Sequence, residues 1–466
     1  MLWDSTRIEG ARLRRFLAWM SLATWVAAAC AQAPEAASAP RPAEFGPPPA
    51  AVDCPAALPA ATHCLGGRDG AGAFYLIAIP QPWNGVLVLH AHGGPTLGPP
   101  KAQRTREDLE RWAVMVKAGY AWAGSTYRDG GVQVRAAGED TERLRRLFVH
   151  DVAVPRVTVL HGQSWGAGVA AIEAETYAAD PVTGRKPYDA VLLTSGVLAG
   201  GSRAYDFRLD LRVVYEALCA NHPRPDEPQY PLWMGLPAGA TMKRAELARR
   251  ADDCLGIQHA AAERTPAQQR RLKTILDVIH IPERTLLAHL DWATFQFQDI
   301  AQHRTGGGSA FGNIGAAYAG SDDDAGLNAH VARYRADPAA VARFAADSDP
   351  TGRIPVPVLT VHAVDDPEAF VEMDSTFRDT MRHAGTADHL VQTFTSDHEH
   401  SYLTDAAYPT LMAALLAWAA GGAKPTPASI AAACPAFEAR FGAGCHFLPD
   451  FYPQPLATRV AARERP

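Results

Sequence analysis

Short apolar runs alternate with stretches of helical spacing along most of the chain. Residues 73–79 and 86–90 are apolar runs with the turn dipeptide Asn84-Gly85 between them, which predicts a pair of strands with a break. Residues 104–117 and 142–150 have helical spacing instead. Further apolar runs of strand length occur at 120–124, 156–160, 190–194, 356–361 and 390–395. This alternation predicts an α/β fold, a mostly parallel sheet with helices on both faces.

A long stretch of chain, residues 195–355, separates two of the expected strands. It greatly exceeds an ordinary connection between strands. Four of its segments have helix-like spacing: 209–218, 242–250, 266–279 and 329–346. We therefore expect a large helical cap, residues 201–354, inserted between late strands of a core formed by 51–200 and 355–466. The last part of the chain, from Pro425, is expected to wrap this core.

A targeting signal is expected in residues 1–30. Arg12, Arg14 and Arg15 stand just before an apolar stretch, 16–29, that is too short to span a bilayer. This pattern is typical of a secretory signal, so we expect an exported protein, periplasmic or secreted. Residues 31–50, rich in Ala and Pro, are expected to form a linker.

Two cleavage sites fit this signal. Cleavage after Ala31 would release a soluble protein, because Ala29-Cys30-Ala31 has the small residues that signal peptidase requires. Cleavage before Cys30 would instead expose a cysteine for acylation, as in a bacterial lipoprotein, and the lipid would attach the protein to a membrane. The sequence leaves both open.

Six cysteines follow Cys30 in the chain: Cys54, Cys64, Cys219, Cys254, Cys434 and Cys445. An even number in an exported chain predicts three disulfides. Short loops close at the lowest entropic cost, which favours pairing of sequence neighbours. The expected pairs are Cys54 with Cys64, Cys219 with Cys254, and Cys434 with Cys445. The chain contains no CxxC pair, which argues against a structural zinc site.

The motif with the most specific chemistry is Gly162-Gln163-Ser164-Trp165-Gly166. It follows an apolar strand directly and precedes a run of small residues that begins a helix. In a G-x-S-x-G motif the serine lies on a strained turn from strand to helix, and the glycines avoid collisions in the tight bend. We expect Ser164 to be a nucleophile. The alternative is a turn serine beside closely packed glycines.

A glycine-rich loop ends an earlier strand, at His92-Gly93-Gly94-Pro95. The backbone N–H of Gly94, or else that of Gly93, could join the N–H of Trp165 in an oxyanion hole. The alternative is a plain turn after a strand. His92 and the nearby His90 are expected to be structural, because a triad histidine in this chain order follows the acid.

An acid and a histidine are expected after the last two strands. Either Asp365 or Asp366 could orient the histidine, and the distance from the strand together with the following Pro367 favours Asp366. The other carboxylate would cap the next helix. His398 and His400 follow the final strand, and we favour His400, with His398 as the second candidate.

The segments HGGP, GQSWG, VHAVDDP and SDHEHSYLTD together resemble the α/β-hydrolase superfamily, over about 74–200 and 355–420 but not over the cap. The resemblance implies an acyl-enzyme on Ser164, His400 as general base and then acid, and hydrolysis by water without a metal or an organic cofactor. HGGP with GxSWG also resembles proline iminopeptidases, which carry a cap in the same place. Thr96, where that family continues with Gly, departs from their pattern.

Composition excludes one class of partner. The chain has 44 Lys and Arg against 50 Asp and Glu, a formal net charge of −6, and no basic run after its first fifteen residues. The electrostatic attraction that drives nucleic-acid binding is therefore missing. The expected partner is a small-molecule ester or a short peptide.

Three functions are consistent with the sequence. The leading one is an exported serine hydrolase of carboxylic esters, because capped, disulfide-bearing secreted α/β-hydrolases are often carboxylesterases, an analogy with that superfamily. The second is a serine aminopeptidase of the proline iminopeptidase type. The third is a non-catalytic binding protein on a hydrolase scaffold. The sequence predicts no metal site and no cofactor, since neither the acidic run 321–324 nor the paired histidines have the spacing of a metal motif.

Overall fold

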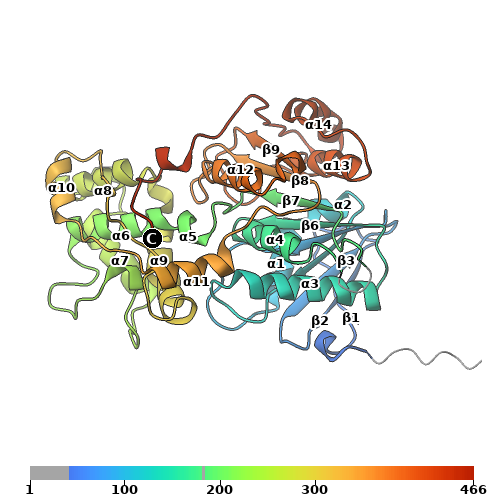
Figure 1. The fold of residues 1–466 in the computed structure, drawn as a ribbon, viewed down its shortest axis with the longest axis horizontal. Helices are drawn as coiled ribbons and strands as arrows, with labels where there is room; N and C mark the ends of the chain where they lie inside the picture. The colour runs from blue at the N-terminus through green and yellow to red at the C-terminus, as the bar shows by residue number, and fades with distance from the viewer. Residues whose placement is uncertain (1–40, 181–183) are drawn as a thin grey trace, which may run out of the picture. The chain divides into compact units, whose positions relative to one another are not determined.

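Nine strands form a single sheet in the computed structural model, which describes residues 41–180 and 184–466 (Figure 1). The expected signal, Cys30 and most of the expected linker lie outside these residues. The strands run in the order β1-β2-β3-β5-β4-β6-β7-β8-β9. Their bounds are Ala50–Ala51 (β1), His63–Arg68 (β2), Phe74–Ile79 (β3), Val86–Ala91 (β4), Ala121–Ser125 (β5), Val157–Gln163 (β6), Ala190–Thr194 (β7), Val358–Ala363 (β8) and Leu390–Thr395 (β9).

The sheet is mostly parallel, as expected. β4 to β9 pair in parallel through five neighbouring contacts, whereas β1, β2 and β3 add an antiparallel edge. The expected pairing of the first two apolar runs is wrong, because β5 lies between β3 and β4. β1 and β2 were not expected, since Gly66-Gly67 interrupts the apolar pattern of β2. Because the parallel strands share one direction, their carboxyl ends meet at one edge of the sheet.

Helices cover both faces of the sheet. Alternate residues of β4 belong to different hydrophobic clusters: Leu87 and Leu89 pack with one set of helices, Val86 and Val88 with the other. The first set is α3 (Val134–Asp151), α4 (Trp165–Thr176) and α12 (Met373–His383). The second set is α1 (Gln103–Arg111), α2 (Ala113–Lys117), α13 (Ala407–Ala419) and α14 (Pro427–Phe441). Burial on both faces explains why the strands are apolar throughout.

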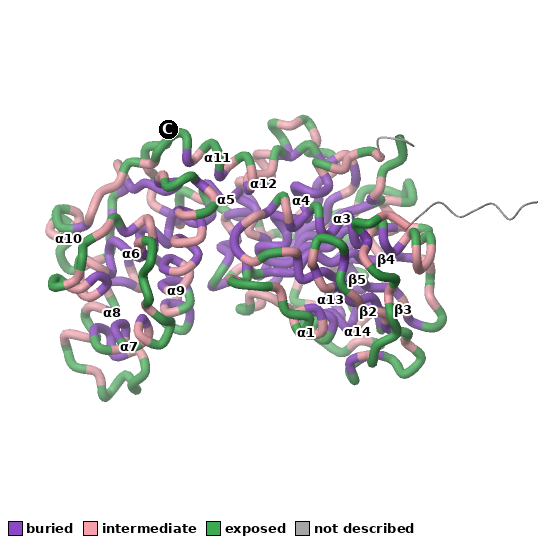
Figure 2. Tube along the Cα trace, turned by 90° about the horizontal axis from the view of Figure 1, so that it is seen from below, coloured by how far each residue is buried: buried purple, intermediate pink, exposed green. Residues whose placement is uncertain are grey.

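A helical cap is inserted in the chain between β7 and β8, which confirms the expected fold class (Figure 1). Its buried residues continue the hydrophobic cluster under α3 and α4, and Figure 2 shows the buried segments along α6 and α9. Its elements are α5 (Gly201–Ala204), α6 (Asp206–Cys219), α7 (Arg244–Leu255), α8 (Pro266–Ile279), α9 (Glu283–Asp299), the π-helical turn η4 (Ile300–Arg304), α10 (Asp324–His330) and α11 (Pro338–Ser348).

Two details of the cap differ from expectation. Helix α9 was not expected, although Leu286, Leu290, Ala293 and Phe297 are buried along one face at helical spacing. The expected helix 329–346 is instead two helices, α10 and α11. Pro338 stands at the first turn of α11, where its fixed φ and missing N–H are compatible only with a helix start.

The structure also differs from expectation at both ends of the described chain. The expected linker 31–50 overlaps the folded part, because Phe45 is only 2% exposed and packs against α3. The last residues do not simply wrap the core. They extend over the cap, where Arg463 contacts Asp210 at 2.5 Å and Arg465 contacts Asp206 at 2.6 Å (Figure 1).

Three disulfides close short loops, and their pairing is the expected one. Cys54 bonds Cys64, Cys219 bonds Cys254, and Cys434 bonds Cys445. The second joins the ends of α6 and α7 within the cap. Among the described helices, none is both long and apolar enough to cross a membrane.

Candidate active site

Ser164 lies at the carboxyl end of β6, on the turn into α4. Its backbone has φ 57° and ψ −123°, a region that side-chain-bearing residues rarely adopt. The turn is held by backbone hydrogen bonds: Ser164 N–H donates to Thr194 O at 2.9 Å, and its carbonyl accepts from Val197 N–H at 3.0 Å. The strained turn therefore presents the hydroxyl at the edge of the sheet.

The flanking glycines are required by close approach of the backbone. A Cβ on Gly162 would lie 2.7 Å from Cα of Ala167, and a Cβ on Gly166 would collide with the carbonyl oxygen of Ala91. Neither neighbour is a flexible side chain that could move aside. This turn therefore requires a glycine two residues before and two residues after Ser164, as the G-x-S-x-G motif provides.

The side chain of His400 lies between those of Ser164 and Asp366 and is hydrogen-bonded to both, so the three form one hydrogen-bonded series. His400 Nε2 lies 2.7 Å from Ser164 Oγ, and His400 Nδ1 lies 2.8 Å from Asp366 Oδ2. Asp366 follows β8 and His400 follows β9, so the ends of three parallel strands supply the three residues. The other two expected candidates, Asp365 and His398, pair with each other at 3.0 Å on the surface, away from Ser164.

The charges of this series are set by burial and by pairing. Burial of the His400 ring favours its neutral form, but the Asp366 carboxylate outweighs that effect and raises the pKa of His400. Burial alone would raise the pKa of Asp366, yet His400 and His362 lower it well below its usual range. Asp366 also accepts the backbone N–H groups of Glu368 at 2.8 Å and Ala369 at 3.0 Å. Asp366 is therefore a fixed carboxylate that orients the histidine.

A second buried pair stands behind Asp366. His362 Nε2 lies 3.1 Å from Asp366 Oδ2 and 2.8 Å from the carbonyl oxygen of Ala369, while its Nδ1 lies 2.6 Å from Asp374 Oδ2. Both ring nitrogens thus face acceptors, so both carry protons. Burial opposes this charge, but Asp374 and Asp366 raise the pKa of His362 to about 10. Sequence reasoning missed His362, although a histidine in the apolar run before Asp366 was a signal.

The glycine-rich loop lies directly over Ser164. A Cβ on Gly93 would lie 2.9 Å from Cβ of Ser164. The carbonyl of Gly93 accepts from Arg104 Nη2 at 2.7 Å and from His92 Nδ1 at 2.9 Å, which fixes the loop. Within residues 41–180 and 184–466, the backbone N–H groups of Gly94 and Trp165 donate to no acceptor. They are thus free to donate to a substrate oxygen.

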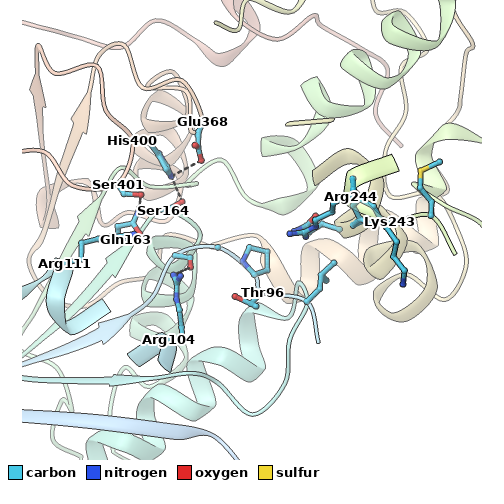
Figure 3. A pocket seen from close by; sticks show the side chains of 18 residues that line it. Thr96, Arg104, Arg111, Gln163, Ser164, Lys243, Arg244, Glu368, His400 and Ser401 are labelled. Carbon is cyan, nitrogen blue, oxygen red and sulfur yellow. Dashed lines mark hydrogen bonds and ion pairs between the residues drawn. The ribbon is translucent and has the colours of Figure 1, made fainter. Parts of the chain in front are cut away.

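A cavity of about 840 Å³ opens above these groups, between the core and the cap (Figure 3). The core side is formed by the glycine-rich loop and by Gln163, Ser164, Glu368, His400 and Ser401. The cap side is formed by residues 242–245 and by Phe295 and Gln296 of α9. In the described part of the chain, no cluster of His, Cys, Asp or Glu is arranged to hold a metal ion.

The fold follows from these observations together. A serine on the strained turn after the central parallel strand β6, an acid after β8 and a histidine after β9, in the chain order Ser, Asp, His, are the arrangement of the α/β-hydrolase fold. The chain has the α/β-hydrolase fold. The helical cap is an insertion into the α/β-hydrolase sheet after β7.

Comparison with known proteins gives weak likenesses only. No protein-family model and no curated protein matches the chain. Feruloyl esterase B from Aspergillus oryzae is 12% identical over 78% of this chain and 81% of its own, with a TM-score of 0.40. The rice cell wall degrading esterase LipA from Xanthomonas oryzae is 14% identical over 72% and 83%, with a TM-score of 0.34. Neither likeness carries information on the activity of this chain.

Proposed function

We propose that this protein is a serine hydrolase that cleaves carboxylic esters through an acyl-enzyme. The hydrogen-bonded series of Ser164, His400 and Asp366 at the floor of the cavity carries the proposal. Ser164 is the nucleophile, His400 is the general base and then the general acid, and Asp366 is the orienting acid.

The reaction has two halves. His400 Nε2 takes the proton of Ser164 Oγ as the oxygen bonds the ester carbon, and the carbonyl oxygen becomes an oxyanion. The N–H groups of Trp165 and Gly94, with Gly93 as the other candidate, hold this oxyanion, and one such donor contributes about 3 kcal/mol. The carbon–oxygen bond then breaks, and the alcohol leaves with the proton from His400. A water molecule, deprotonated by His400, next attacks the acyl carbon. The bond between that carbon and Ser164 Oγ then breaks, His400 returns the proton to Ser164 Oγ, and the carboxylic acid leaves.

We assign residues 201–354 to a cap domain that selects the substrate, on a core of 51–200 and 355–466. The cap supplies one wall of the cavity, through 242–245 and α9, but none of the three reacting residues. Of the cap aromatics, Phe295 lines the cavity, whereas Phe297 and Phe311 stack on each other in the cap interior with their ring centres 4.5 Å apart. Acyl and alcohol preference therefore depends on few cap side chains.

An aminopeptidase of the proline iminopeptidase type is the second candidate. It requires a carboxylate near the site for the free amine of the substrate, and Glu368 Oε2 lies 3.9 Å from His400 Nε2. Other acids of the cap that could hold such an amine, Glu216, Asp299 and Asp322 to Asp324, do not line the cavity. Arg104, Arg111, Lys243 and Arg244 do line it, and their charge disfavours a cationic substrate. A non-catalytic binding protein ranks third, since it has no need of the aligned series.

Export is part of the proposal. Three disulfides are typical of proteins in an oxidising compartment, outside the cytosol. Anchoring through an acylated Cys30 stays a prediction from the sequence.

The test compares wild type with Ser164→Ala on short and long acyl aryl esters and on a prolyl arylamide. We expect ester turnover that falls by at least about 10⁴-fold in the variant, because nucleophile and base act as a unit. Prolyl arylamide turnover above ester turnover would replace the esterase with the peptidase. Equal turnover by both proteins would reject Ser164 as nucleophile.

A further inference from the structure

Arg208, near the start of α6, is a buried cation without a counter-ion. Its side chain leaves the residue only 7% exposed. Across residues 41–180 and 184–466, its guanidinium makes no hydrogen bond and no ion pair, and its Nε is completely buried. The two terminal nitrogens also lack partners but keep access to solvent. A guanidinium in this state is unusual, because a buried charge is normally paired.

Aromatic rings hold the guanidinium in place. Its Cζ lies 4.4 Å from the ring centre of Trp292, 4.7 Å from that of Phe207 and 5.3 Å from that of Tyr205. Such stacking stabilises a cation and fixes its plane, but it provides no hydrogen-bond acceptor. Burial lowers the pKa of Arg208 to about 10, so the group is still charged at neutral pH. Its five N–H donors are therefore positioned and unused.

Arg208 is not among the residues that line the cavity, but it packs on a helix, α9, that supplies two of them. Trp292, on which it stacks, precedes Phe295 and Gln296 by three and four residues on α9, and these two residues line the cavity. On the core side, Arg208 is close enough to Glu368, another cavity residue, for their charges to interact. Burial and, after it, the charge of Arg208 lower the pKa of His289, whose Nε2 lies 2.9 Å from the carbonyl oxygen of Pro367, next to Asp366.

The cavity itself has an excess of positive charge. Arg104, Arg111, Lys243 and Arg244 line it, against a single carboxylate, Glu368. Figure 3 shows Arg244 on the cap side, directed toward the space above Ser164. Arg104 is bound to Gly93 and Asp108, so it serves the loop, and Arg244 pairs with Asp291 at 3.3 Å. Arg111 and Lys243 have no ion pair within the described residues, and both are exposed. The field of the cavity therefore favours an anion.

We propose that Arg208 binds an anionic group of the substrate, so that this hydrolase selects esters that carry a carboxylate. This inference rests on the proposed ester hydrolysis and names its substrate class. Arginine suits the role because its planar fork binds a carboxylate through two parallel hydrogen bonds. The carboxylate would belong either to the acyl part or to the alcohol part of the ester.

The experiment uses two matched pairs of esters. Nitrophenyl hydrogen glutarate against nitrophenyl hexanoate places the anion in the acyl part, and acetoxybenzoate against phenyl acetate places it in the alcohol part. We expect kcat/KM for the anionic member of one pair to exceed that of its neutral partner by about tenfold or more, and Arg208→Met to reduce that ratio by about tenfold or more. The pair that responds identifies the part of the ester that carries the charge.

Arg378→Met is the matched control. Arg378, on α12, also stacks on a ring, with its Cζ 3.9 Å from the centre of Tyr452, but that ring is exposed and, unlike Trp292 of α9, belongs to no element that lines the cavity. Its variant should keep the wild-type ratios. Ratios near one in the wild type, or ratios that Arg208→Met leaves unchanged, would overturn the inference. If Arg208→Met does not fold, Arg208→Lys keeps the charge without the fork, and the preference should still fall.

A binding measurement separates this inference from the proposed reaction. Glutarate should raise the Tm of Ser164→Ala in a concentration-dependent way, and this shift should disappear in Ser164→Ala with Arg208→Met. If no ester is turned over but the shift is present, the ester hydrolase fails and the anion site stands. If esters are turned over but the shift is absent, the anion site fails and the hydrolase stands.

Discussion

Asp366 and Arg208 are both buried charged residues, Asp366 in the core and Arg208 in the cap, but their surroundings differ. Asp366 accepts hydrogen bonds from His400, His362 and two backbone N–H groups. Arg208 is surrounded by three aromatic rings and has no acceptor in the described chain. The charge of Asp366 is thus neutralised by protein groups, whereas Arg208 of the cap has no counter-ion within the described residues.

This difference separates two tasks. A reacting series must have the same geometry in every turnover, so each of its members is held by protein groups. A specificity group must exchange partners with each substrate, and an unpaired donor in a dry site discriminates strongly against substrates that leave it unpaired.

Removing the charge of Asp366 should have the largest effect. Asp366→Asn keeps the shape of the side chain but no longer favours the required tautomer of His400, and we expect kcat to fall by about 10⁴-fold. Asp365→Asn is the matched control, because Asp365 is exposed and pairs with His398 instead of His400. Equal losses in the two variants, measured with one aryl ester, would contradict the assignment of the orienting acid.

Breaking the pair behind Asp366 should weaken the fold. Asp374→Asn leaves the buried His362 without its second carboxylate, and we expect the free energy of unfolding to fall by about 3–5 kcal/mol. Asp379→Asn, also on α12, removes an exposed pair with Arg382 and should change it by less than about 1 kcal/mol. Urea unfolding of both variants measures the difference. Similar values would show that the second pair does not support the site.

The pH profile should report both buried histidines, with opposite signs. His400 must be neutral to accept the serine proton, and its pKa is raised, so kcat/KM should fall tenfold per pH unit below a midpoint above the ordinary 6.5. His362 is charged in the folded state with a pKa of about 10. Its stabilising contribution is therefore complete below about pH 6.5 and decreases as pH rises toward 10. An activity midpoint well below 6.5 would contradict the pairing of His400 with Asp366.

Removing the charge of Arg208 should have the smallest effect on the free energy of unfolding, and it should raise this free energy instead of lowering it. Arg208→Met takes away an uncompensated buried charge together with its stacking, and we expect the free energy of unfolding to rise by about 1 kcal/mol. Thermal unfolding without any ligand measures this change. A loss of several kcal/mol would mean that Arg208 serves the fold and would remove the contrast with Asp366.

The sequence by itself determined the features that depend on neighbouring residues. The parallel strands, the turn at Ser164 with its two glycines, and the three short disulfide loops all follow from local patterns. The sequence could favour Asp366 and His400 over Asp365 and His398, but it could not place any of them beside Ser164. Asp365 and Asp366 have nearly the same neighbours in the sequence, as do His398 and His400. Only the folded path of the backbone decides which member of each pair points toward Ser164.

The tertiary structure alone decided the contacts between distant segments. Ser164 and His400 are 236 residues apart in sequence, and the support of Asp366 by His362 and Asp374 depends on how α12 packs against β8. Arg208 looks in the sequence like any charged residue of an amphipathic helix. Its burial against Trp292, beside the cavity and without a counter-ion, results from the packing of α6 on α9. Burial and pairing are properties of the assembled fold, which no local pattern encodes.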